Sequence, residues 1–103
     1  MSQKRILIVE DSMEIGRMLQ AALKTMNTEY AVTWMRSAEE AILETSRHNL
    51  DLVVTDIRLP GIDGFELIRR IRRRLPLVHV IIVSGLPEHE LRKQVAEVKP
   101  DVV

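Results

Sequence analysis

Carboxylate side chains that directly follow apolar runs are the groups of this chain best placed to do chemistry. Glu10 and Asp11 follow the apolar residues 6–9, and Asp56 follows residues 52–55. Three carboxylates gathered at one place repel one another, so one of them would be driven to protonate unless a divalent cation neutralised them. Hard oxygen ligands with room for water favour magnesium. These residues therefore predict a magnesium site, provided that the fold brings them together.

The apolar runs before these carboxylates are typical of strands that are buried on both faces of a parallel sheet. Four strands are predicted, over residues 6–9, 31–34, 52–56 and 78–83. Helices are predicted between and after them: one capped by Ser12, one that begins with the capping box of Ser37 and Glu40, one over residues 65–75 and one over residues 87–98. Strands that alternate with helices at this spacing pair in parallel, which indicates an α/β fold.

The first and third helices have contrasting side-chain patterns. The first is expected to pack on the sheet through one apolar stripe of residues spaced three and four apart: Ile15, Met18, Leu19, Ala22, Leu23 and Met26. The third has three inward residues, Ile68, Ile71 and Leu75, interleaved with five arginines: Arg69, Arg70, Arg72, Arg73 and Arg74. For these arginines a solvated face is favoured, and a docking surface for an acidic partner stays open.

The strand ends are where an open α/β sheet binds its ligands, because the binding site lies beyond the carboxyl ends of the strands. Glu10, Asp11, Asp56 and Ser84 would all lie at that edge. Simpler readings remain for each of them. Asp56 could be only a turn or capping residue, the acidic pair could be a solvated pair favoured by a helix dipole, and Ser84 could belong to a plain turn.

Three segments of the sequence carry a family resemblance. They are ILIVEDS over residues 6–12, VVTDIRLPGIDGFEL over residues 53–67 and VIIVSG over residues 80–85. An acidic pair, an Asp-x-x-x-Pro-Gly-x-Asp-Gly loop and a Ser-Gly strand end in this order resemble the receiver domain of two-component response regulators. The resemblance implies a flavodoxin-like doubly wound parallel sheet with strand order 2-1-3-4-5, with residues 1–103 forming a single receiver domain.

The resemblance also implies roles for individual residues. Asp56 would be the nucleophile that receives a phosphoryl group from a histidine kinase, a phosphotransfer protein or a small phosphodonor. Asp11 would bind Mg²⁺ directly, Glu10 largely through water, and the backbone carbonyl of Arg58 would supply another oxygen. Ser84 would donate its hydroxyl to the attached phosphoryl group and signal the modification by moving toward it. Glu10 stands where the family often has Asp, and its longer side chain suits a ligand that acts through water.

The family's lysine at the end of a fifth strand is the element that this chain matches least well. Lys99 is followed by proline, as in the family. However, a helix over residues 87–98 would travel roughly 18 Å down the sheet, and no return strand precedes Lys99. The favoured assignment makes Lys99-Pro100 the turn into strand five, which would leave strand five and the last helix truncated or absent. The alternative, in which Lys99 takes the place of the family's lysine, stays open.

Composition excludes several classes of function. Basic and acidic residues both total 15, so the net charge is zero and gives no general reason to expect a nucleic-acid or membrane binder. Without cysteine, disulfides, thiolate zinc sites and Cys nucleophiles are excluded. The apolar runs are too short to span a membrane and the N-terminus does not resemble a cleavable signal peptide, so a cytoplasmic location is predicted.

The predicted function is a signalling module that catalyses only its own phosphorylation and dephosphorylation and acts on an output domain or partner protein. A pseudo-receiver, which would signal by protein contact without phosphorylation, is the main alternative. An aspartate-based phosphohydrolase is disfavoured. That class typically has a second aspartate two residues after the nucleophile, and this chain has Arg58 there.

Overall fold

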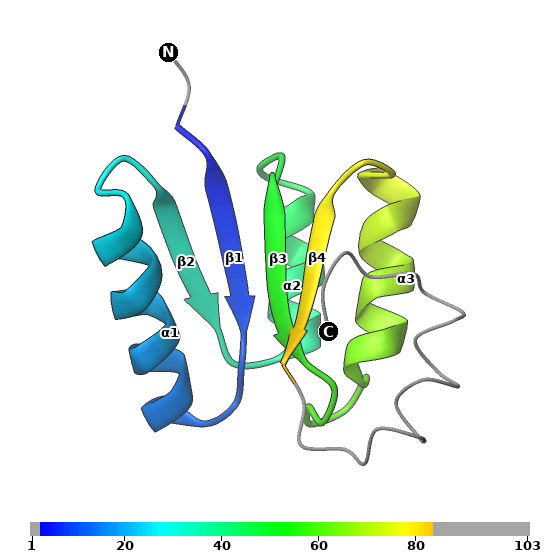
Figure 1. Ribbon diagram of the computed structural model, residues 1–103. Coiled ribbons are helices and arrows are strands. Elements are labelled where there is room, and N and C mark those ends of the chain that lie inside the picture. Colours follow the sequence, from blue (N-terminus) through cyan, green and yellow to red (C-terminus); the bar gives the residue numbers. More distant parts are fainter. Residues whose placement is uncertain (1–2, 84–103) are drawn as a thin grey trace.

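A four-stranded parallel sheet forms the centre of the protein (Figure 1). The computed structural model describes residues 3–83. The strands are β1 (Arg5–Val9), β2 (Ala31–Met35), β3 (Leu52–Asp56) and β4 (His79–Val83), and the helices are α1 (Met13–Met26), α2 (Ala38–Thr45) and α3 (Gly64–Arg74). The strand order is β2-β1-β3-β4, which confirms the predicted order of the first four strands. The expected fifth strand and the helix over residues 87–98 lie outside the described residues.

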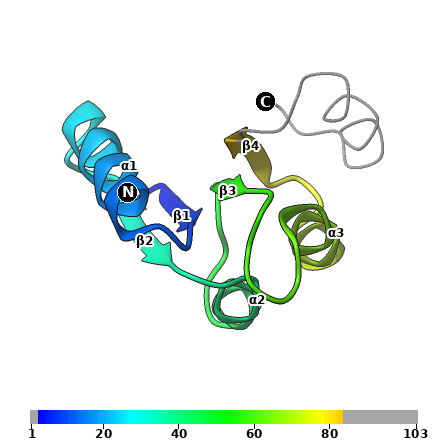
Figure 2. The ribbon, with the colours of Figure 1, turned by 90° about the horizontal axis from the view of Figure 1, so that it is seen from below.

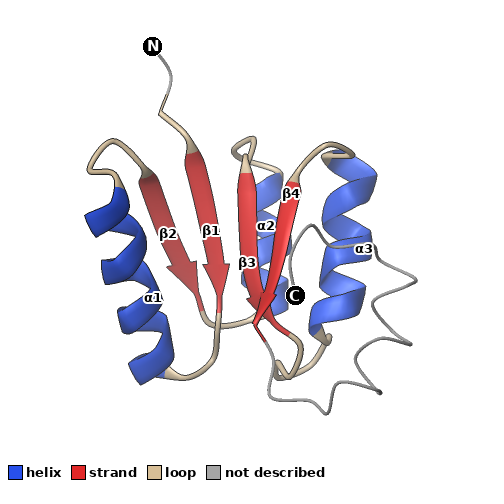
Figure 3. Ribbon diagram, viewed as in Figure 1, coloured by secondary structure: helices blue, strands red, loops and turns tan. Residues whose placement is uncertain are grey.

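The helices cover the sheet from two sides (Figures 2 and 3). α1 lies on one face, where it contacts β1 and β2, and α2 and α3 lie together on the other face. This arrangement is the doubly wound α/β layering that the alternation of elements predicted. In residues 3–83, no helix combines the length and the apolar character needed to cross a membrane.

Polar side chains determine where the helices begin. The hydroxyls of Ser12 and Ser37 each accept a backbone N–H from the first turn of the following helix, at 3.3 Å, so both predicted caps are confirmed. Asp63 caps α3 in the same way, because its Oδ1 accepts the Glu66 N–H at 2.9 Å. α3 therefore begins at Gly64, one residue before its predicted start.

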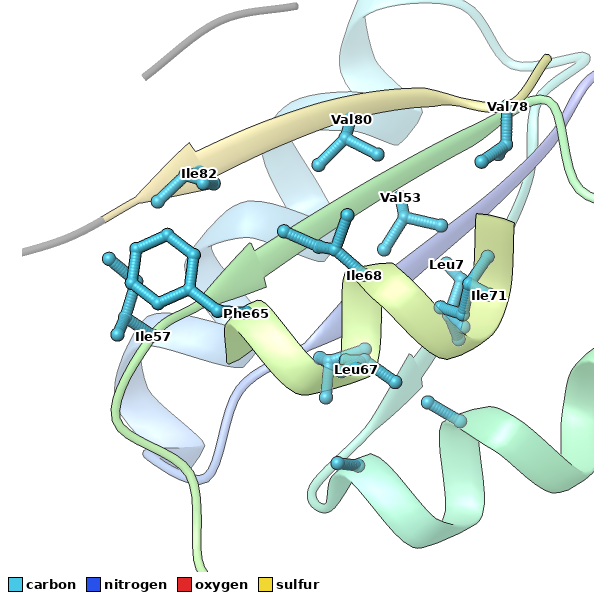
Figure 4. Packing of buried hydrophobic residues seen from close by; sticks show 13 residues of the cluster. Leu7, Val53, Ile57, Phe65, Leu67, Ile68, Ile71, Val78, Val80 and Ile82 are labelled. Atoms are coloured by element: carbon cyan, nitrogen blue, oxygen red, sulfur yellow. The ribbon is translucent and has the colours of Figure 1, made fainter. Parts of the chain in front are cut away.

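The larger part of the core lies between the sheet and the helices α2 and α3 (Figure 4). Every second residue of a buried strand points to this face, as Leu7 and Val9 do in β1. α3 contributes Phe65, Leu67, Ile68 and Ile71, all of them buried. The arginines between them are exposed except Arg72, which is half-buried. This exposure fits a solvated face and a docking surface equally, so the choice between the two stays a prediction.

The face of α1 that packs on the sheet differs from the predicted stripe. Leu19 and Leu23 pack against the smaller core cluster, which consists of Ile6, Ile8 and Val54 on the other face of the sheet. Met18, in contrast, is 60% exposed, and Ile15, Ala22 and Met26 are exposed as well. The prediction was wrong for these four residues. α1 instead approaches β2 through Gly16, where a β-carbon would collide with the indole ring of Trp34. Contact through Gly16, Leu19 and Leu23 turns the methionine side of the helix outward.

Candidate metal centre

Three carboxylates from two neighbouring strands lie together at the carboxyl edge of the sheet. Glu10 and Asp11 follow β1, and Asp56 is the last residue of β3. The two strands pair in parallel, with Val9 opposite Thr55, so they end at the same level. One oxygen of each carboxylate lies within 4.8 Å of the others. Hard oxygen donors from three side chains fit a small divalent cation.

The three carboxylates have different surroundings. Glu10 is only 2% exposed, Asp56 is half-buried and Asp11 is exposed. Glu10 Oε2 accepts the backbone N–H of Ser12 at 3.0 Å. One oxygen of Asp56, Oδ1, accepts the N–H groups of Ile57 and Arg58, at 2.6 and 3.3 Å. These hydrogen bonds orient Asp56, and among residues 3–83 none engages its Oδ2.

Burial raises the pKa of Glu10 above its ordinary value of 4.5. The backbone N–H of Ser12 opposes this shift, whereas a hydrogen bond with the Asp11 side chain and the negative charges of Asp56 and Asp11 add to it. Glu10 therefore resists ionisation in the absence of a cation. A bound divalent ion would remove the electrostatic part of that resistance.

Because its pKa is raised, Glu10 makes folding depend on pH when no metal is bound. The folded protein holds the Glu10 proton more tightly than the unfolded chain, so this stabilisation is complete below pH 4.5 and is lost as pH rises through the higher folded pKa. In EDTA, the free energy of unfolding of the wild type should fall over this window relative to Glu10→Gln, and magnesium should reverse the fall. Urea denaturation of both proteins between pH 4 and 8 gives the two free energies of unfolding. If the difference between them does not vary with pH, the raised pKa of Glu10 is contradicted.

Of the other predicted site residues, the structure describes Arg58 but not Ser84 or Lys99. Arg58 contacts the cluster through its backbone N–H, which donates to Asp56. The proposed role of its carbonyl as a metal ligand stays a prediction. Ser84 and Lys99 lie outside the described residues, so their predicted roles also stay predictions.

The loop between β3 and α3 approaches the site very closely. At Gly64 a β-carbon would collide with the backbone carbonyl oxygen of Asp56, and the Gly64 N–H donates to the Ile57 carbonyl at 2.8 Å. Gly61 has a φ of 77°, a conformation that favours glycine. The two glycines of the Pro-Gly-x-Asp-Gly motif therefore shape the loop that leads away from Asp56.

Contacts from the end of β2 are the part of the site that the sequence analysis missed. Trp34 Nε1 donates to the Glu10 carbonyl at 2.9 Å, and the Glu10 N–H donates to the Met35 carbonyl at 3.0 Å. Arg36 Nη2 donates to the Asp11 carbonyl at 3.0 Å. The signal was available, since Arg36 follows a predicted strand and so belongs at the same sheet edge as the carboxylates.

Comparisons with known proteins all point to the same protein family. Residues 6–101 match the response regulator receiver domain. The transcriptional regulatory protein ResD of Bacillus subtilis is 32% identical over 100 residues, which cover 97% of this chain and 40% of ResD. A protein-glutamate methylesterase/protein-glutamine glutaminase of Syntrophus aciditrophicus is 35% identical over 89 residues, 86% of this chain and 25% of that protein. This chain thus spans well under half the length of these relatives.

Solved structures show the same fold. The signal receiver domain of an HD domain-containing protein from Pseudomonas fluorescens Pf-5 has a TM-score of 0.88 and 25% identity, over 99% of this chain and 74% of that one. The response regulator protein TrrA of Thermotoga maritima, solved in complex with Mg²⁺-BeF, has a TM-score of 0.84 and 30% identity, over 97% of this chain and 84% of that one. With the match over residues 6–101, they confirm the predicted family: the chain belongs to the response regulator receiver domains.

Proposed function

We propose that this chain accepts a phosphoryl group on Asp56 in a magnesium-dependent reaction and thereby switches contacts with an output domain or partner protein. One observation carries the proposal: carboxylate oxygens of Glu10, Asp11 and Asp56 lie within 4.8 Å of one another at the carboxyl edge of a receiver-type sheet. Membership of the receiver family and the similarity to TrrA, which was solved with Mg²⁺-BeF, support it.

The nucleophile in this proposal is Asp56 Oδ2. The other oxygen, Oδ1, is occupied by the N–H groups of Ile57 and Arg58, which hold the carboxylate in one orientation. Oδ2 attacks the phosphorus of a phosphohistidine, a P–O bond forms as the P–N bond breaks, and the imidazole of the donor keeps the electron pair. The product is an acyl phosphate on Asp56.

The acidic residues around Asp56 would hold the metal. Asp11, the exposed carboxylate, would bind it directly, and the buried Glu10 would act largely through water. Asp56 itself and the Arg58 carbonyl would be the remaining protein ligands. Magnesium, when bound, supplies positive charge that neutralises the transferring phosphoryl group. Ser84 would donate its hydroxyl to that group and would signal the modification by moving toward it.

The phosphoryl donor would be a histidine kinase or a phosphotransfer protein, and residues 1–103 would act as one receiver domain. The named relatives include a transcriptional regulator and a methylesterase, each much longer than this chain. Receivers of this kind thus occur with different outputs. The chain itself would act as a switch whose only reaction is its own phosphorylation and dephosphorylation.

Beryllofluoride, which mimics an attached phosphoryl group, tests the proposal directly. Addition of beryllofluoride together with Mg²⁺ to the ¹⁵N-labelled protein should shift the amide resonances of Ile57, Arg58 and Gly64, because these groups contact Asp56 or its loop. Mg²⁺ alone should cause a smaller change, and beryllofluoride in EDTA none. The absence of any response to the combination would favour the pseudo-receiver and overturn the proposal.

A further inference from the structure

The end of β2 is attached to the backbone of both acidic residues that follow β1. Three hydrogen bonds of 2.9 to 3.0 Å make this attachment: Trp34 Nε1 to the Glu10 carbonyl, the Glu10 N–H to the Met35 carbonyl, and Arg36 Nη2 to the Asp11 carbonyl. None of them uses a carboxylate oxygen of Glu10 or Asp11. The contacts therefore fix the acidic loop and leave its metal-binding atoms available.

The same stretch of chain also reaches the loop after Asp56. Glu39, in the first turn of α2, accepts the Ile62 N–H with Oε1 at 3.3 Å. Glu39 also lies against Gly61, where an added β-carbon would come within 2.6 Å of its Oε1. Residues 34–39, which we call the β2–α2 junction, therefore contact both loops that flank Asp56.

From these contacts we infer that the β2–α2 junction positions the metal centre, with Arg36 as the residue that holds Asp11 in place. This inference rests on the proposed function, since it concerns the same magnesium site. Asp11 is exposed and the carboxylates repel one another. Trp34 and Met35 hold the backbone of Glu10, so the Arg36 contact is the one of the three that keeps Asp11 itself close to Asp56. A guanidinium donor forms a charge-assisted hydrogen bond, which suits it to this task.

A substitution of Arg36 tests the positioning of the metal site more cleanly than a substitution of Trp34 would. Trp34 packs against Gly16 and the smaller core cluster, so its replacement would also disturb folding. Arg36 is exposed and belongs to neither hydrophobic cluster. Its replacement should therefore leave the fold intact and act on the acidic loop alone.

Magnesium titration followed by the indole N–H resonance of Trp34 tests the inference. The chain has one tryptophan, so this resonance is single, and its hydrogen bond to the Glu10 carbonyl makes it a reporter of the site. Arg36→Gln is expected to raise the magnesium dissociation constant about tenfold, as removal of a group that orients metal ligands typically does. Arg36→Lys should give an intermediate value because one charged donor is kept. The thermal midpoint in EDTA should match that of the wild type.

Arg47→Gln is the matched control, since Arg47 is exposed just beyond the C-terminal end of α2 and its side chain has no hydrogen bond or ion pair within residues 3–83. Its magnesium affinity should equal that of the wild type. Glu39→Ala should also weaken magnesium binding, because it removes the oxygen that accepts the Ile62 N–H and so loosens the loop that follows Arg58. Equal affinities for Arg36→Gln, Arg47→Gln and the wild type would overturn the inference while leaving the proposed function in place. A wild type that binds no magnesium would defeat both.

Discussion

Replacement of Asp56 by asparagine is expected to abolish the incorporation of acid-labile phosphate from acetyl phosphate. An amide cannot form the acyl phosphate, and the two neighbouring carboxylates belong to the proposed metal ligands rather than to the nucleophile. Wild type and variant are incubated with labelled acetyl phosphate and Mg²⁺. The label that stays on the precipitated protein, and its release by acid or by hydroxylamine, are then measured. The wild type should carry phosphate that hydroxylamine releases, and Asp56→Asn should give only background.

Asp51→Asn provides a matched control at the opposite end of the sheet. Asp51 directly precedes β3, and its Oδ2 accepts the Arg5 N–H at 2.8 Å, so it is an oriented carboxylate away from the cluster. This variant should still incorporate phosphate. Asp56→Asn should keep its fold, since an asparagine Oδ1 can accept the same two N–H groups, and its thermal midpoint tests this. Phosphate incorporation into Asp56→Asn at the wild-type level would contradict the assignment of the nucleophile.

The replacement Phe65→Ala should have the largest effect on stability, a loss of about 3–5 kcal/mol in the free energy of unfolding. Phe65 is 2% exposed and lies in the first turn of α3, where its ring packs beside Ile57 and Ile82 (Figure 4). Its removal would leave a cavity among buried neighbours, which adds to the lost transfer free energy of the ring. Domains have total stabilities of about 5–15 kcal/mol, so the loss would be a large share of the total. Urea denaturation at equilibrium gives the value.

Leu77→Ala is the control for this loss. Leu77 is also a large apolar residue, but it is 91% exposed in the turn before β4, so its truncation should change stability by less than about 0.5 kcal/mol. The slope of the free energy against urea concentration should be the same for both variants if each unfolds in one step. Similar losses for Phe65→Ala and Leu77→Ala would mean that the core does not depend on this aromatic side chain.

Much of the fold could be predicted because its signals are local. Ser12 and Ser37 each announce a helix within three residues, and apolar β-branched runs mark all four described strands. The convergence of Glu10, Asp11 and Asp56 was also predictable. This convergence requires only that β1 and β3 be parallel neighbours. The resemblance to the receiver family implied a strand order in which they are.

The side of α1 that faces the sheet could not be predicted from its apolar spacing. Met18 and Met26 fit the helical period as well as Leu19 and Leu23 do, yet they point outward. The choice depends on Gly16, which lets the helix approach the indole ring of Trp34, eighteen positions later in the sequence. Only the packed structure brings these two residues into contact.

The sequence by itself determined the alternation of strands and helices, the helix caps and the three carboxylates at one edge of the sheet. The tertiary structure alone decided that Glu10 is buried with a raised pKa and that Trp34, Met35 and Arg36 hold the acidic loop. The physical reason is the range of the interactions. Caps and strand patterns act between near neighbours in the chain, whereas burial and the β2 contacts depend on how strands that are distant in sequence align when the sheet forms.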